Sequence, residues 1–231
     1  MKYFAVPVLI GMLLLLGPIL PANAAPQEEA LRLNTSTAVL QDVMRIPEQG
    51  IPADLIRSAY GIAVFPDLIK FGLGIGRTRG NGVLVVRRAD GSWSDPSFLR
   101  LSGGSLGFQA GVASTDLILV FRTARGLQQI ERGKLTLGGT ISIAAGPIGR
   151  TGQAATDSQL RSEILSYSRS RGLFAGVAIE GASLKYDFRA NEDFFGVADP
   201  IRTQMASIPP AARNFMCVLS RYSGAPTNVC A

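Results

Sequence analysis

The chain has 231 residues, with 23 Lys and Arg against 17 Asp and Glu, and it contains no histidine. The lack of histidine excludes Ser-His-Asp and Cys-His nucleophile systems, HExxH zinc sites and nearly every histidine-bearing metal centre. The formal net charge of +6 favours an anionic partner, and most of the basic residues are arginine, which binds phosphate in a bidentate manner.

The N-terminal segment has the pattern of a secretory signal peptide. Lys2 precedes the apolar run from Phe4 to Leu20, and Ala22-Asn23-Ala24 is a small-x-small cleavage site. The alternative is a transmembrane anchor, but prolines and glycines interrupt a run that is barely long enough to cross a bilayer. We therefore expect residues 1–24 to be a signal peptide cleaved near Ala24, and the protein to be periplasmic or envelope-associated. In that location phospholipid headgroups are favoured over nucleic acid as partners.

The first element expected after this segment is a helix from Gln27 to Met44, followed by a linker, so that residues 25–50 form an N-terminal helix and linker. Its apolar stripe has spacings of three and four and consists of Ala30, Leu33, Thr37, Leu40 and Met44. Arg32 and Gln41 lie off this stripe. The helix is expected to cover a sheet, and the alternative is an amphipathic helix that touches a membrane.

The next part of the chain predicts a short helix and then strands joined by turns. The helix runs from Ala53 to Ala59, and a buried strand from Gly61 to Phe65 is expected to stop at Pro66. From Phe71 to Val112 we expect a β-meander with a basic surface and a glycine-lined face, because glycines alternate with bulky residues. Asn81-Gly82 is read as its first turn and Ala89-Asp90-Gly91 as its second.

The rest of the chain adds further strands and two C-terminal helices. The expected elements are a strand buried on both faces at Thr115–Arg122, a helix at Ala124–Arg132, strands at Lys134–Ala145, Ile164–Arg169, Leu173–Ile179 and Leu184–Phe188, a turn or single helical turn at Asn191–Phe195, and helices at Pro200–Ser207 and Pro210–Tyr222. We therefore predict an α+β fold, mostly β, with a curved antiparallel sheet that forms a closed or nearly closed barrel with packed helices.

The two cysteines, Cys217 and Cys230, are expected to form one disulfide that staples the C-terminal helix. Catalytic motifs are weak. Gly103-Gly104-Ser105-Leu106-Gly107 satisfies G-x-S-x-G but continues as strand and has no histidine base. A carboxylate pair could come from a scattered set, namely Asp67, Asp90, Asp95, Asp116, Glu180, Asp187 and Asp193. No catalytic residue, cofactor or metal is predicted.

The basic residues near the meander are the stronger candidates for a site. The predicted lipid-binding residues are Lys70, Arg77, Arg79, Arg87, Arg88 and Arg100. Pairing across a hairpin at Asn81-Gly82 would bring Arg77, Arg79 and Arg87 together, with Phe71 and Trp93 nearby, to hold a phosphate headgroup. The alternative is a solvated, salt-bridged sheet face.

At this point the sequence resembles the SYLF domain family. The similarity covers roughly Ile51 to Gly196 and divides the chain into a SYLF-like β domain at 51–196 and a C-terminal helical extension at 197–231. It is carried by residues 59–111 (AYGIAVFPDLIKFGLGIGRTRGNGVLVVRRADGSWSDPSFLRLSGGSLGFQAG), by TDLILVF at 115–121, by GTISIAAGPIGR at 139–150, by YSRSRGLFAGVAIEGASL at 167–184 and by NEDFFG at 191–196.

The resemblance implies phospholipid binding through a basic surface, and in some members also through an N-terminal amphipathic helix. Some eukaryotic relatives also bind actin. Because this chain carries an export signal and neither an SH3 nor a FYVE domain, an anionic phospholipid of a bacterial envelope is the expected partner, and actin is not expected in this context. The alternatives are an envelope scaffolding or assembly protein and a carboxylate-dependent hydrolase.

Overall fold

The structure is a computed structural model that describes residues 24–45, 50–73, 75–106, 111–147, 161–171, 179–203, 205, 207–227 and 230. The predicted signal peptide therefore lies outside the described residues, except for Ala24. Nearly all of the strand expected at Leu173–Ile179 also lies outside them.

The described part of the chain contains one eight-stranded sheet. Its strands are β1 (Gly61–Leu73), β2 (Ile75–Val86), β3 (Ser97–Leu106), β4 (Gly111–Phe121), β5 (Leu135–Thr136), β6 (Ile143–Ala145), β7 (Ile164–Arg171) and β8 (Ser183–Tyr186). The spatial order is β5-β8-β3-β2-β1-β4-β7-β6, and every pair is antiparallel except β6 with β7. The predicted α+β, mostly β class with a curved sheet is confirmed, and the sheet curls into a half-barrel rather than a closed one.

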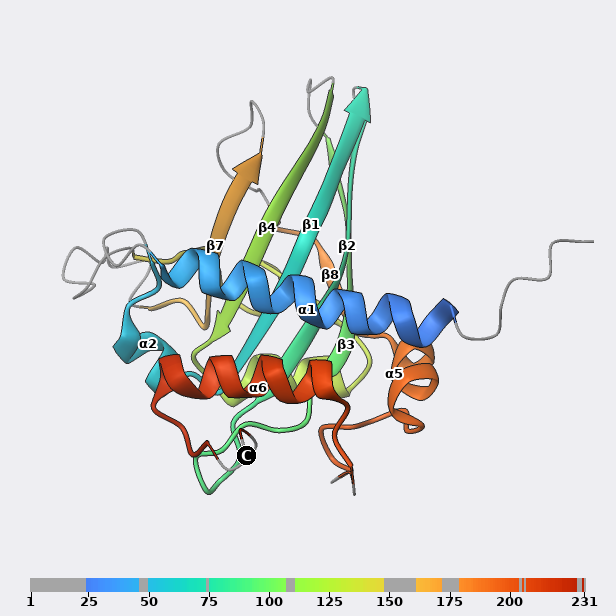
Figure 1. The fold of residues 1–231 in the computed structure, drawn as a ribbon. Coiled ribbons are helices and arrows are strands. Elements are labelled where there is room, and N and C mark those ends of the chain that lie inside the picture. Colours follow the sequence, from blue (N-terminus) through green and yellow to red (C-terminus); the bar gives the residue numbers. More distant parts are fainter. Residues whose placement is uncertain are drawn as a thin grey trace, which may run out of the picture.

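Five described helices accompany the sheet: α1 (Ala24–Met44), α2 (Ala53–Ser58), α3 (Ala124–Glu131), α5 (Phe188–Phe195) and α6 (Pro210–Ser223). Helices α1 and α6 lie side by side across one face of the sheet (Figure 1). The four long strands β1 to β4 run beneath them, and β1, β2 and β4 project beyond α1 (Figure 1). The expectation that the N-terminal helix covers the sheet is thus confirmed.

Each face of the sheet has its own core, because successive side chains along a strand point to opposite faces. On the helix face, Ile62 and Val64 of β1 pack with Leu33 of α1 and Phe215 of α6. On the other face, Phe65 joins a second cluster to which α3 contributes Leu127 and Ile130. The strand at 115–121 supplies both clusters in alternation, as its continuous apolar run predicted.

Two predicted interruptions are absent from the described strands. Strand β1 continues through Pro66, because a bulge between Phe65 and Leu68 absorbs the irregularity. At this bulge Asp67 has a φ of 50°, and its backbone N–H donates to Asp116 Oδ1 at 3.2 Å. Strand β2 likewise continues through Asn81-Gly82, so the predicted turn there is wrong. A Cβ at Gly82 would overlap the ring of Phe65, so this glycine makes room for packing.

Other boundaries also differ from expectation. The region Lys134–Ala145 forms the short strands β5 and β6 with a turn between them, and Gly138 in that turn has a φ of 73°. Strand β8 ends at Tyr186, because the Asp187 side chain accepts a hydrogen bond from Ala190 N–H and caps α5. The described residues of the helix expected at Pro200–Ser207 form turns and bends.

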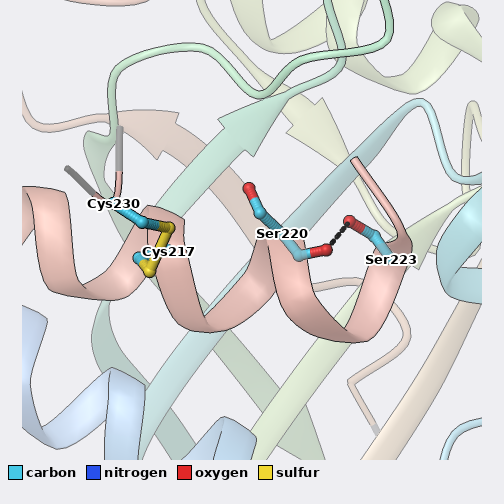
Figure 2. Close-up of a disulfide and its surroundings, with 4 residues drawn as sticks. All are labelled: Cys217, Ser220, Ser223 and Cys230. Carbon is cyan, nitrogen blue, oxygen red and sulfur yellow. Dashed lines mark hydrogen bonds between the residues drawn. A yellow bond between two sulfur atoms is a disulfide. The ribbon is translucent and has the colours of Figure 1, made fainter. Parts of the chain in front are cut away.

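The C-terminal extension is held together by a disulfide and hydrogen bonds, and one hydrogen bond links it to the segment before β3. As predicted, Cys217 on α6 forms a disulfide with Cys230, and their Cα atoms lie 5.2 Å apart (Figure 2). The Ser223 hydroxyl donates to the Ser220 carbonyl on the same helix (Figure 2). The same hydroxyl accepts a hydrogen bond from Trp93 Nε1 at 2.9 Å. Helix α6 ends at its C-cap residue, Gly224, which has a φ of 64°.

Candidate functional site

A groove of about 390 Å³ lies between α1 and the neighbouring parts of β1 and β2. We call it the helix–strand groove. Helix α1 forms one wall, and the bulge and following residues of β1 form the other together with β2. Its lining residues are Glu28, Leu31, Arg32, Thr35, Pro66, Asp67, Ile69, Phe71, Arg79, Gly80 and Asn81. Both walls of the groove therefore carry polar and apolar side chains.

Three large apolar side chains of this groove are exposed. Leu31 on α1 is 65% exposed, and Ile69 and Phe71 on β1 are 46% and 45% exposed. We call these three residues the apolar rim. Further back along β1, Ile62 and Val64 are fully buried in the core that the helices cover. Ile69 and Phe71 thus continue the helix-side face of β1 beyond the part that the described helices cover.

Arg77 and Arg79 lie on β2 directly opposite the rim. In the antiparallel register Arg77 pairs with Phe71, and Arg79 pairs with Ile69, so each arginine shares a face with an apolar neighbour. Both arginines are exposed. Within the part of the chain that the structure describes, neither guanidinium has an ion pair or a side-chain hydrogen bond.

Arg100 is the third predicted site residue on this face. It lies on β3 opposite Asn81, two positions along β2 from Arg79. Its Nε donates to Asp187 Oδ2 at 2.7 Å, while about half of the side chain stays exposed. Three of the six predicted basic residues are thus on one face, and Arg100 is partly neutralised.

The other three predicted residues lie elsewhere. Lys70 follows Leu68 by two positions, and Leu68 belongs to the core on the opposite face, so Lys70 lies on that face as well. Burial lowers the pKa of Lys70. Arg88 contacts Asp95 at 3.5 Å and donates to the Trp93 carbonyl at 3.2 Å, near the loop after β2.

Arg87 has a structural role in the loop region. It donates to the backbone carbonyls of Ala59, Gly91 and Ile56 at 2.9, 2.9 and 3.0 Å, and lies 4.1 Å from the Trp93 ring centroid. The predicted closeness of Arg87 to Arg77 is wrong, because β2 is continuous. Ten residues of extended strand separate them, about 33 Å at a rise of about 3.3 Å per residue. Trp93 is only 2% exposed and does not reach the groove.

A buried charge cluster fixes α1 beside the groove. Arg32 Nη1 lies 2.9 Å from Glu29 Oε2 and 3.9 Å from Asp187 Oδ2, and its guanidinium stacks 5.1 Å from the Phe98 ring centroid. Arg100 contacts the same Asp187 carboxylate. Burial raises the pKa of Glu29 to about 7 although Arg32 acts in the opposite direction. Burial also lowers the pKa of Arg32. For both residues the loss of solvation thus outweighs the attraction between the opposite charges.

Arg32 was placed off the buried stripe by its sequence position, and the structure buries it. The cue was the spacing from Glu28 and Glu29, which are four and three residues before it on one helix. That spacing indicates an ion pair on the helix, but it does not say that the pair is covered. Burial depends on Asp187 and Phe98, which come from distant parts of the chain.

Five of the seven scattered carboxylates have hydrogen-bond partners. Asp90 and Asp95 line a separate cavity of about 230 Å³, where Asp90 accepts from Ser92, and Asp95 accepts from Arg88 and from Met205 N–H. Burial raises the pKa of Asp95. Glu180, which directly follows the strand expected at Leu173–Ile179, is exposed in a turn. Gly103 and Gly104 lie within β3, so the described part of the G-x-S-x-G motif is strand and not a nucleophile elbow.

None of the described helices combines the length and the hydropathy needed to cross a bilayer. The helix–strand groove combines exposed apolar side chains with Arg79, and Arg77 lies near it on β2, so we take the groove as the candidate site.

Comparison with known proteins finds a match to the model of the Ysc84 family, described as Las17-binding protein actin regulator, over residues 102–222. The chain is 34% identical over 178 residues to Protein YSC84 of Saccharomyces cerevisiae, an overlap that covers 74% of this chain and 38% of that protein. It is 35% identical over 178 residues to LAS seventeen-binding protein 3 of Saccharomyces cerevisiae, covering 74% of this chain and 39% of that relative.

A human relative is also similar. The chain is 35% identical over 150 residues to SH3 domain-containing YSC84-like protein 1 of Homo sapiens, covering 64% of this chain and 44% of that protein. The chain thus spans less than half the length of these curated relatives. The family and the second yeast relative are both named as binding proteins.

Proposed function

The chain belongs to the Ysc84 family, and from this premise we propose that it is a non-enzymatic protein that binds anionic phospholipid through the helix–strand groove. The family membership confirms the resemblance to the SYLF domain family that the sequence indicated. We propose the bacterial cell envelope as the place of binding, in keeping with the signal-like segment at residues 1–24.

The observation that carries this proposal is the pair of exposed, unpaired arginines, Arg77 and Arg79, beside the groove. A guanidinium binds phosphate bidentately, and one that has no carboxylate partner does not have to break an ion pair first. Arg32 and Arg100 are close on the same side but are held by Glu29 and Asp187. We therefore assign the phosphate contacts to Arg77 and Arg79, with a smaller contribution from Arg100.

A vesicle flotation assay tests the proposal. The exported protein is mixed with vesicles of neutral phosphatidylcholine, with or without phosphatidylglycerol, at low and high salt. We expect binding that requires the anionic lipid and weakens as salt increases. Each arginine near an anionic surface contributes about 1 kcal/mol, so neutralising both in Arg77→Gln/Arg79→Gln should weaken binding about 30-fold.

The matched control changes two exposed cations in another part of the fold. Arg132 and Lys134 are also exposed and two residues apart, but they follow α3 on the other side of the sheet. Arg132→Gln/Lys134→Gln removes the same amount of charge. Equal losses in the two double variants, with both proteins folded by circular dichroism, would show that only net charge matters and would refute the assigned site.

The family description favours a second candidate function. The matching model is described as Las17-binding protein actin regulator, which favours a protein partner and hence a scaffolding or assembly role in the envelope. Native mass measurement of the exported protein separates the two functions. A stable complex with a protein, together with no affinity for anionic vesicles, would favour the scaffolding role.

A further inference from the structure

The apolar rim is not explained by phosphate binding. Leu31, Ile69 and Phe71 come from two different elements, line the same groove and are each about half exposed or more. A dissolved phosphate group gains no binding energy from contact with such apolar side chains. A bilayer surface can bury them, because its headgroup layer overlies an apolar acyl region.

The register places charge and apolar surface at adjacent positions. Each unpaired arginine is the cross-strand neighbour of one rim residue: Arg77 of Phe71, and Arg79 of Ile69. A long arginine side chain can reach the phosphate level while an adjacent apolar side chain enters the acyl boundary. The two kinds of side chain therefore suit a single flat interface that is anionic at its surface and apolar just below.

Two acidic residues also line the groove, and both have contacts within the protein. Glu28 lies 3.7 Å from Arg32 Nη2 and shares this guanidinium with Glu29. Asp67 accepts a hydrogen bond from the Ser114 hydroxyl at 3.2 Å and is held in the bulge of β1. Arg77 and Arg79 on β2 thus bring positive charge next to the apolar rim, which suits an anionic membrane.

We infer that the apolar rim inserts into the acyl boundary of an anionic bilayer, so that this site recognises a lipid surface and not a free phosphorylated headgroup. The inference rests on the proposed function, since it concerns the same groove. It adds that Leu31, Ile69 and Phe71 supply a part of the binding that salt does not weaken, because burial of apolar surface is not screened.

Insertion can be measured with a tryptophan reporter. In Phe71→Trp the new indole sits in the rim, and vesicles with brominated acyl chains should quench its fluorescence. Tyr60→Trp is the matched control, because Tyr60 is 50% exposed and lies eleven residues away along β1, roughly 35 Å. The wild-type Trp93 is buried and provides the background in all three proteins. We expect strong quenching in Phe71→Trp alone.

A second variant tests the energetic contribution. Ile69→Ser/Phe71→Ser removes the exposed apolar surface of β1 and keeps both arginines. We expect its binding to phosphatidylglycerol vesicles to fall about tenfold, and the binding that remains in the wild type at high salt to disappear. Binding of soluble glycerol 3-phosphate should be equally weak in both proteins.

The outcomes separate this inference from the proposed function. Wild-type protein that fails to float with anionic vesicles would refute the proposed function itself. Vesicle binding that remains intact in the serine variant, without quenching in Phe71→Trp, would refute only the insertion and leave a headgroup site. A rim-dependent dimer in native mass spectrometry, with no vesicle binding, would instead assign the rim to a second copy of the chain and overturn the inference.

Discussion

Replacing Glu29 by glutamine should remove a pH dependence of stability that the wild-type protein shows between about pH 5 and pH 8. Glu29 is a buried residue of α1. The charged residues near it are Arg32 and Glu28 from the same helix, Asp187 from the start of α5 and Arg100 from β3. Burial raises its pKa from 4.5 to about 7. The folded protein therefore holds a proton at pH values where the unfolded chain has released it.

The sign follows from proton linkage. Between pH 4.5 and 7 the folded state binds more protons than the unfolded state at this group, so the free energy of unfolding falls as pH rises. The stabilisation that comes from the raised pKa of Glu29 is fully present below pH 4.5 and is lost above about pH 7. At 1.36 kcal/mol per pKa unit, the loss is at most about 3 kcal/mol. Glutamine does not titrate, so Glu29→Gln should lack this loss.

The assay is urea unfolding followed by circular dichroism at pH 5, 6, 7 and 8, compared between wild type and Glu29→Gln. Glu28→Gln is the matched control, because Glu28 is the adjacent, exposed residue of the same helix and also contacts Arg32. The chain has no histidine to titrate in this range. Wild-type stability that rises or stays constant from pH 5 to 8, or an unchanged slope in Glu29→Gln, would refute the reasoning.

Two further predictions concern the fold around the site. Arg87→Ala should lower the free energy of unfolding by about 2 to 3 kcal/mol, because three backbone carbonyls lose a charged donor, while vesicle binding per folded molecule stays unchanged. A specific loss of lipid affinity in this variant would contradict the structural role. Gly82→Ala should destabilise by about 1 to 3 kcal/mol, because the new Cβ would meet the Phe65 ring and lie 2.6 Å from the Val64 carbonyl. Gly104→Ala is the comparison, since its nearest neighbour would be 3.8 Å away, and similar stabilities of the two variants in thermal unfolding would speak against this account.

Sequence patterns predicted the elements whose side chains report on their surroundings. The continuous apolar run at 115–121 indicated a strand buried on both faces, and it supplies both cores in alternation. The stripe that includes Leu33 and Leu40 indicated a helix against a sheet, and both residues are fully buried. Periodicity works here because each residue type reflects which face it occupies.

The wrong predictions concern residues whose role depends on neighbours that are distant in the sequence. Asn81-Gly82 has the composition of a hairpin turn, but it lies within β2. Gly82 is needed there because a side chain would overlap the ring of Phe65 on the neighbouring strand β1. Pro66 usually ends a strand, yet a bulge supported by Asp116 carries β1 past it. The wrong turn at Asn81-Gly82 also led to the prediction that Arg87 lies beside Arg77. The groove could not be foreseen, because it needs α1 to lie against β1 and β2, a packing choice that no local pattern records.

The short strands at the margins of the sheet limit how this protein can associate with others. In the described part of the chain the sheet ends at β5, with two residues, and at β6, with three. A margin this short offers few free backbone groups to a neighbouring chain, which disfavours fibrous aggregation through added strands. Association through these two marginal strands would therefore be limited to short backbone pairings, and a stable contact there would need side chains as well.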